Sequence, residues 1–237
     1  MRKLVAGAAM LVALHAQADY QCSVTPQDDV VITPQSVQVT GASGNLQITP
    51  QGEVRQNGQL LTLDGATRQK AIDYQAALRR DLPWIDQGAR QRLERGRLAL
   101  DKVVVEKLGS NSSVRGRLTT LDGQLKQQMN RIIEHRSDGL TFHHQAIDQV
   151  RQDGERIVQS SLGGVVQDSL NEMGTRQALS GDNPLQAVMG NLGGLQQAIQ
   201  QEWSNQEQDF QHFGREVCNR VTALESQRQG LTAALPK

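Results

Sequence analysis

The chain has 237 residues, with 25 basic and 25 acidic side chains, so its formal net charge is zero. Apolar residues make up 37% of the chain and aromatic residues only 3%, whereas glutamine occurs 32 times. This composition excludes a nucleic-acid binder that relies on a basic surface, a polytopic membrane protein and a collagen-like fibre. It also argues against a pocket built from aromatic side chains.

The first eighteen residues have the three parts of a secretory signal peptide. Residues 1–3 (MRK) form a short positive segment, residues 4–14 form an apolar run, and Ala16-Gln17-Ala18 is a small-x-small cleavage site. The apolar run is shorter than the roughly 18 residues that a membrane-spanning helix needs. We therefore predict cleavage between Ala18 and Asp19. The mature chain would then have 219 residues, a net charge of −2 and no transmembrane segment.

Cys22 and Cys218 are the two cysteines of the chain. In a secreted protein an isolated pair most simply forms a disulfide, which here would close a loop of nearly the whole mature chain. The chain-entropy model gives such a loop up to ~5 kcal/mol of stabilisation. A redox-active pair is the alternative, but such pairs usually form a Cys-x-x-Cys motif, which this sequence lacks. We therefore predict a structural disulfide.

The start of the mature chain has the alternating pattern of β-strands. Apolar residues recur with a period of two, as at Val37 and Val39, and turn signals separate the runs. Asn57-Gly58 between two alternating runs is typical of a hairpin, because a type I′ turn needs positive φ at both central residues. We predict four or five short strands that form an antiparallel β-meander over residues 19–65, with one solvated and one covered face.

After residue 65 the apolar period becomes helical, and we predict a helical bundle with a coiled-coil-like region over residues 66–237. The fold class is therefore α+β and mostly α: an N-terminal antiparallel β-meander followed by a bundle of long antiparallel helices. Pro83 is expected to end one helix and begin the next. A further helix is expected from Val114 to near Asp138-Gly139, and another over residues 147–173. Residues 180–184 (SGDNP) are the clearest stop signal.

The last helical segment has the most regular spacing in the chain. Its apolar residues, from Leu185 to Leu224, follow one another at steps of three and four, close to a heptad repeat. An unbroken helix to about Arg228 would be ~65 Å long. Gly193-Gly194 and Gly214 could bend or split it, and the sequence leaves this open. The glutamines are interpreted as an uncharged outer surface on the helices, since glutamine is a good helix former.

Catalytic and metal-binding patterns are sparse. His143 and His144 are adjacent and would point about 100° apart on a helix, so they cannot share a metal unaided. His135 could face the same way as His143, with Glu134 and Asp138 nearby. The sequence contains no His-x-x-x-His, Glu-x-x-His, Gly-x-Ser-x-Gly or Walker A motif. We interpret these histidines as residues of a helix corner and predict no enzyme, cofactor or metal site. A hydrolase that uses His135, His143 or His144 with Glu134 is an alternative.

Two further features have structural interpretations. Gly163-Gly164 and Gly193-Gly194 lie in apolar helical stripes, where they favour close helix packing or a kink over a hinge. A cluster of basic residues alternates with acidic ones, so we expect opposite charges to offset it, and nucleic acid is not an expected partner. The basic residues of this cluster are Arg90, Arg92, Arg95, Arg97 and Lys102.

The start of the predicted mature chain carries distinctive strings. Residues 19–30 are DYQCSVTPQDDV, residues 41–48 are GASGNLQI and residues 52–55 are GEVR. These strings resemble the enterobacterial periplasmic YggN family, whose domain is classed as of unknown function, and the resemblance extends over the whole precursor. It implies a periplasmic location in a Gram-negative envelope and no established activity. It offers no functional residues to carry over.

These patterns together predict a non-enzymatic periplasmic envelope protein without a cofactor. The long amphipathic helices and the polar glutamine faces favour a helical scaffold that binds or chaperones envelope polypeptides. The alternative is a small-ligand or lipid-binding protein, in which the meander and the glycine-containing helices enclose a groove. The oligomeric state stays open.

Overall fold

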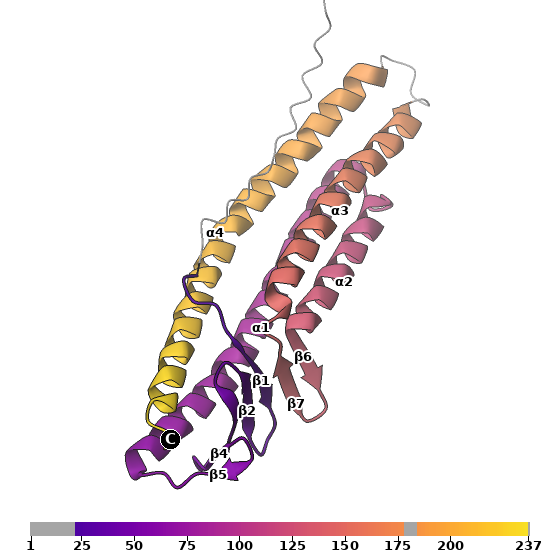
Figure 1. The fold of residues 1–237 in the computed structure, drawn as a ribbon. Coiled ribbons are helices and arrows are strands. Elements are labelled where there is room, and N and C mark those ends of the chain that lie inside the picture. Colours follow the sequence, from indigo (N-terminus) through magenta and orange to yellow (C-terminus); the bar gives the residue numbers. More distant parts are fainter. Residues whose placement is uncertain (1–21, 178–183, 237) are drawn as a thin grey trace, which may run out of the picture.

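The computed structural model describes residues 22–177 and 184–236. This part of the chain forms one antiparallel sheet at the end of four long helices (Figure 1). The strands are β1 (Asp28–Ile32), β2 (Val37–Gly41), β3 (Gly44–Ile48), β4 (Val54–Gln56), β5 (Gln59–Leu60), β6 (Ile133–Arg136) and β7 (Gly139–Phe142). The helices are α1 (Gly65–Leu108), α2 (Val114–Ile132), α3 (Ala146–Gln177) and α4 (Pro184–Thr232).

The first five strands form the predicted meander. The sheet order is β5-β4-β3-β2-β1-β7-β6, and every neighbouring pair is antiparallel. Val39 of β2 pairs with Val30 of β1 on one side and with Leu46 of β3 on the other, and all three are buried. The turn between β4 and β5 has φ of 51° at Asn57 and 84° at Gly58, as the Asn-Gly signal predicts. The α+β class and the strand meander are thus confirmed.

The β6–β7 hairpin corrects the prediction of a helix that continues to Asp138-Gly139. The helix ends at Ile132, and the chain turns into two strands that extend the sheet beside β1. Ile133, Leu140 and Phe142 are buried in the core that this sheet shares with the helices. Ile132 and Ile133 fit both a helical and a strand period, so local spacing alone could not separate the two structures.

Pro83 lies inside α1, so the prediction that it separates two helices is wrong. An interior proline costs a helix about 3 kcal/mol. Contacts between α1 and α4 on both sides of Pro83 offset this cost. Asp81 is ion-paired with Arg220 of α4, and the Trp84 ring lies 5.3 Å from that of Phe213.

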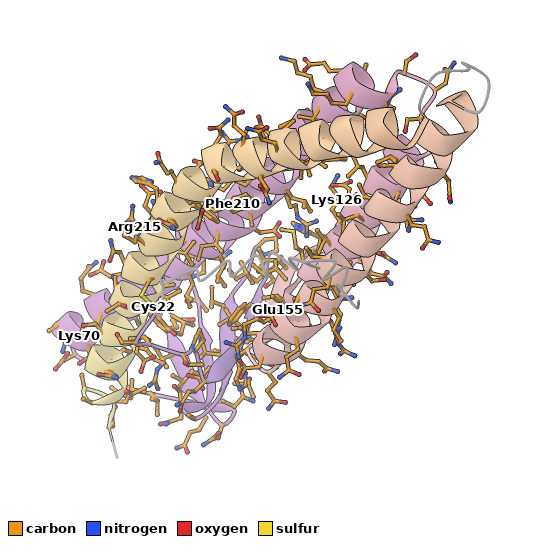
Figure 2. The ribbon with its side chains drawn as sticks, turned by 90° about the horizontal axis from the view of Figure 1, so that it is seen from above. Cys22, Lys70, Lys126, Glu155, Phe210 and Arg215 are labelled. Atoms are coloured by element: carbon orange, nitrogen blue, oxygen red, sulfur yellow. A yellow bond between two sulfur atoms is a disulfide. The ribbon has the colours of Figure 1, made fainter. Side chains whose placement is uncertain are left out.

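The last helix, α4, is continuous through Gly193-Gly194 and Gly214. Its 49 residues correspond to about 74 Å at 1.5 Å per residue. In Figures 1 and 2, α4 lies on one side of the molecule and the α2–α3 pair on the other. The predicted stop at residues 180–184 agrees with the start of α4 at Pro184, and residues 178–183 lie outside the described part.

Two apolar cores hold the helices together. The larger joins the helix-facing side of the sheet to α1 and the C-terminal end of α4. The smaller lies toward the far end of the bundle and joins Leu108, Val114, Val165 and Leu195 of the four helices. In the described residues, no helix has a stretch apolar and long enough to cross a bilayer.

The glycine pairs differ in their surroundings. A Cβ at Gly164 would collide with the end of the Arg117 side chain of α2, so this glycine leaves room for that side chain. Gly163 and Gly194 face open space. A further close approach, which the sequence did not reveal, occurs at Gly88, where a Cβ would lie 2.5 Å from the Phe213 ring.

Candidate binding pocket

The structure gives His135 a different carboxylate partner from the adjacent His143 and His144. His135 lies on β6, and its Nε2 is 2.7 Å from Asp86 Oδ2 of α1. His143 and His144 follow β7 in a turn, so their prediction as helical residues is wrong. His144 Nδ1 lies 2.6 Å from Asp29 Oδ1, and His143 Nε2 lies 3.4 Å from Glu134 Oε2.

The contacts of these histidines are with carboxylates. Burial raises the pKa of Asp29, but hydrogen bonds from the side chain and backbone of His144 outweigh it, so the pKa is lowered. Across the residues that the structure describes, no group of three or more potential ligands is placed to hold a metal ion. His135 thus connects β6 to α1, whereas His143 and His144 both contact Asp29 of β1 and His143 also contacts Glu134 of β6.

The basic cluster on α1 is offset by opposite charges, as predicted. Arg90 pairs with Asp86, and both Arg92 and Arg95 pair with Asp209 of α4. Arg97 pairs with Glu94, and hydrogen bonds from Arg97 and Lys126 lower the pKa of Glu94 to about 2. Lys102 lies 4.0 Å from Glu106. The pairs with Asp86, with Glu106 and between Arg97 and Glu94 lie within α1, whereas Asp209 and Lys126 connect α1 to α4 and α2.

A pocket of about 720 Å³ lies between the sheet, α1, α4 and the beginning of α3. This volume is within the range of small-molecule sites in proteins. Most of its wall is aliphatic, and Tyr74 and Phe142 are its only aromatic side chains among the described residues. The apolar wall consists of Val24, Val30, Leu78, Leu82, Ile85, Ile132, Ile133, Phe142, Ile147, Val217, Val221 and Leu224.

Several of these apolar side chains are only half-buried because they border the pocket. Ile85 on α1, Ile147 on α3, and Val217 and Val221 on α4 are in this class. They come from three helices that the sequence places far apart. An apolar ligand that covered them would gain the favourable free energy of removing apolar surface from water.

Charged residues of β1 and α4 also line the pocket. Arg228 of α4 donates hydrogen bonds to both oxygens of the Glu225 carboxylate and to Ser43 Oγ. Asp28 Oδ2 lies 3.6 Å from Arg228 Nε, and Asp28 also accepts hydrogen bonds from the backbone and hydroxyl of Ser43. The hydrogen bond from Arg228 lowers the pKa of Glu225. We call Asp28, Ser43, Glu225 and Arg228 the polar cluster.

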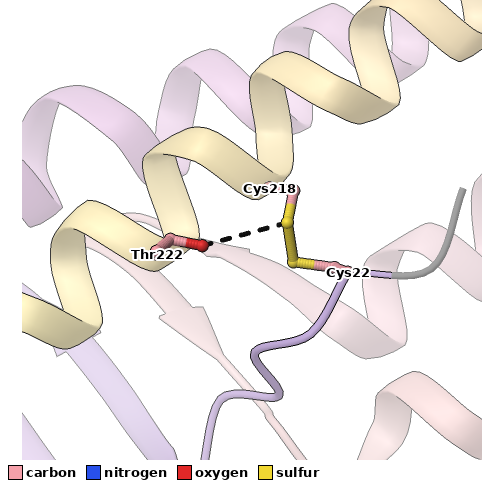
Figure 3. Close-up of a disulfide and its surroundings, with 3 residues drawn as sticks. All are labelled: Cys22, Cys218 and Thr222. Atoms are coloured by element: carbon pink, nitrogen blue, oxygen red, sulfur yellow. Dashed lines mark hydrogen bonds between the residues drawn. A yellow bond between two sulfur atoms is a disulfide. The ribbon is translucent and has the colours of Figure 1, made fainter.

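The disulfide between Cys22 and Cys218 borders the same pocket, and the predicted pairing is confirmed. It joins positions 196 residues apart, with the two Cα atoms 5.5 Å from each other. Figure 3 shows that it attaches the extended segment before β1 to α4. Residues 22–28 of that segment supply part of the pocket wall. The predicted cleavage site at Ala18 and Asp19 lies outside the described residues.

The pocket is not the groove that the sequence suggested. None of its wall residues is a glycine, and its strand side chains come from the helix-facing side of the sheet. Tyr74 and Arg228, which are 154 positions apart, belong to no motif. Two signals in the sequence pointed toward this site. Tyr74 is a polar aromatic residue beside the apolar stripe of α1. The predicted disulfide placed the start of the mature chain against the last helix.

Comparison with known proteins identifies relatives over the whole chain. A family model described as "Protein of unknown function (DUF2884)" matches residues 22–237. The chain is 58% identical over 237 residues to proteins described as "Uncharacterized protein YggN" from Escherichia coli strains K12 and O157:H7. Each alignment covers 99% of both chains. No solved structure matches.

Proposed function

The chain belongs to the DUF2884 family, and we propose that it is a non-enzymatic binding protein for the apolar part of a small amphiphilic molecule. The observation that carries the proposal is the pocket of about 720 Å³ with a mainly aliphatic wall. Large apolar pockets that contain a few convergent polar groups are the usual form of small-molecule sites. This pocket combines an apolar wall with the polar cluster and with the Asp148–Arg151 ion pair of α3.

The pocket favours ligand binding over the polypeptide scaffold that the helix pattern suggested first. A chaperone for unfolded chains needs a contiguous exposed apolar surface. The described residues expose few large apolar side chains: Leu60 of β5, Leu98 and Val105 of α1, and Phe210 of α4. The helix surfaces instead carry ion pairs such as Arg95–Asp209. The pocket is a concave apolar surface formed by the described residues.

A role without catalysis fits the contacts of the candidate acid–base residues. His135 and His144 each make a short contact with a carboxylate, to Asp86 and Asp29 respectively. Neither histidine, nor His143, belongs to the pocket wall. These three histidines therefore lie outside the pocket wall, and the wall carboxylates of Asp28 and Glu225 are engaged with Ser43 and Arg228.

A periplasmic location is part of the same proposal. The pattern of residues 1–18 and the disulfide both support it, because structural disulfides persist in oxidising compartments. The intact mass of protein from a periplasmic extract should correspond to residues 19–237. A full-length mass of residues 1–237 confined to the cytosolic or membrane fraction would contradict the location.

Filling the pocket should block ligand binding. Val221→Trp places an indole in the space that half-buried Val221 borders on α4. N-phenyl-1-naphthylamine is an uncharged apolar dye whose fluorescence rises in apolar surroundings. We expect it to bind the wild-type protein at one site, and we expect Val221→Trp to weaken that binding at least tenfold.

Two further variants control this experiment. Ala223→Trp adds the same side chain at an exposed position of α4 outside the pocket wall, and should leave dye binding unchanged. Ile147→Trp fills the pocket from α3 and should act like Val221→Trp, which guards against a folding defect specific to α4. Equal dye affinity in all four proteins, or no binding by the wild-type protein, would refute the proposed function.

A further inference from the structure

Tyr74 has an unusual position in the pocket wall. It lies on α1 with only 3% of its surface exposed, and it lines the pocket. No hydrogen bond joins its hydroxyl to another described residue, although a buried tyrosine hydroxyl usually has a partner. The hydroxyl is also not among the fully enclosed unpaired side-chain atoms, so it is accessible and available as a donor to a molecule in the pocket.

The neighbouring polar cluster has its own partners. The Arg228 guanidinium is occupied by Glu225 and Ser43, and Asp28 accepts two hydrogen bonds from Ser43. The polar cluster has two carboxylates (Asp28 and Glu225) and one guanidinium (Arg228), which gives it a formal charge of −1 beside Tyr74. An anionic ligand group would thus meet a net negative charge in surroundings that screen it poorly.

Tyr74 remains a donor under physiological conditions. Burial raises the pKa of its hydroxyl far above the usual value, and the negative charge of Asp28 raises it further. The hydroxyl is therefore protonated at neutral pH and can donate to a carbonyl or ether oxygen. An uncharged acceptor takes this hydrogen bond without the repulsion that a carboxylate would meet. A quaternary ammonium group, which the negative charge would attract, has no acceptor for the hydroxyl.

The apolar wall continues from Tyr74 along one face of α1. Leu78, Leu82 and Ile85 follow it at steps of four, four and three residues, and all of them line the pocket. At 1.5 Å per residue this stripe is about 16 Å long. The stripe borders the pocket from the donor to half-buried Ile85, with Leu78 and Leu82 only 3% and 5% exposed between them.

We propose that the pocket selects an uncharged amphiphile, with Tyr74 as hydrogen-bond donor to an ester or amide carbonyl and the hydrocarbon chain along α1. This inference rests on the proposed function and adds the class of ligand. It predicts discrimination between molecules that share one chain and differ in the charge and hydrogen-bonding groups of the polar end.

Three probes with the same twelve-carbon chain test this selectivity: monolauroylglycerol, laurate and dodecyltrimethylammonium. Each is used below its micelle concentration to displace N-phenyl-1-naphthylamine. The wild-type protein should bind the neutral ester most tightly. Tyr74→Phe removes only the hydroxyl and should weaken ester binding about two- to tenfold, the range for one hydrogen bond. Its affinities for the dye and for laurate should stay within about twofold of wild type.

Thr40→Val is the matched control, because it removes a hydroxyl from an exposed position of β2 whose side chain alternates with buried Val39. It should change none of the affinities. Tighter binding of laurate or of the cation by wild type, or equal ester affinity in Tyr74→Phe and wild type, would overturn the proposed selectivity. Dye binding is measured separately. If wild type binds the dye but shows no preference for the ester, the proposed function stands and only the selectivity fails. If wild type does not bind the dye, the proposed function itself is refuted.

Discussion

Replacing Cys22 and Cys218 together by serine is expected to lower the free energy of unfolding by about 2–5 kcal/mol and to weaken dye binding strongly. The disulfide closes a loop of 196 positions, so its loss frees the unfolded chain and releases the segment before β1 from α4. That segment supplies part of the pocket wall. Urea unfolding followed by circular dichroism, together with dye titration, measures both effects.

Reduction of the wild-type protein with dithiothreitol should reproduce the behaviour of the double variant. Thr222→Ala is the control, because Thr222 Oγ1 lies 3.9 Å from the Cys218 sulfur and its loss leaves the disulfide in place. This variant should match wild type in both measurements. A double serine variant with unchanged stability and unchanged dye affinity would show that the disulfide shapes neither the fold nor the pocket.

Replacing Asp81 by asparagine should cost about 3 kcal/mol of stability. Its side chain is 2% exposed and is ion-paired with Arg80 and with Arg220 of α4. Arg220 also lies over the Trp84 ring, 3.9 Å from its centre. Removing one member of a buried pair leaves the other charge uncompensated, which costs about 3–5 kcal/mol. The lower end applies because the Arg220 side chain is 33% exposed.

This loss should depend on pH. Burial raises the pKa of Asp81, but hydrogen bonds from Arg80 and Arg220 outweigh it and leave the pKa below its usual value. The carboxylate therefore stabilises the folded state above the unfolded-state pKa of about 3.9. The stabilisation disappears as the pH falls through the lower folded-state pKa. Urea unfolding at a series of pH values should show the gap between wild type and Asp81→Asn shrinking below about pH 4.

Asp148→Asn is the control for this charge, because Asp148 and its partner Arg151 are 77% and 67% exposed. It should change stability by no more than about 0.5 kcal/mol at any pH, as exposed pairs do. A stability gap between wild type and Asp81→Asn that stays constant down to pH 2 would contradict the assigned role of the Asp81 carboxylate.

Local patterns predicted the parts of this fold that local physics determines. The alternation around Val37 and Val39 and the Asn57-Gly58 turn predicted the meander, because a period of two and positive φ are properties of short segments. The regular three- and four-residue steps predicted α4, in which the glycines cause no break. The disulfide followed from there being only two cysteines in a chain that resembles an exported protein.

The predictions that the structure corrects failed because contacts between distant parts of the chain decide the outcome. Pro83 stays within α1 because contacts from Asp81 and Trp84 to α4 act on both sides of it. The β6–β7 hairpin forms because β1 offers an edge to β7, with Val30 opposite Phe142. The pocket could not be predicted, since its wall depends on how α1, α3 and α4 lie around that sheet.

Native mass spectrometry tests most directly whether the pocket holds an apolar ligand. Wild type, Val221→Trp and Ala223→Trp, each purified without detergent, are incubated with monolauroylglycerol and measured side by side. We expect one bound molecule per chain in wild type and Ala223→Trp, and little or none in Val221→Trp. Bare protein masses for wild type, or equal occupancy in all three proteins, would contradict ligand binding in the pocket.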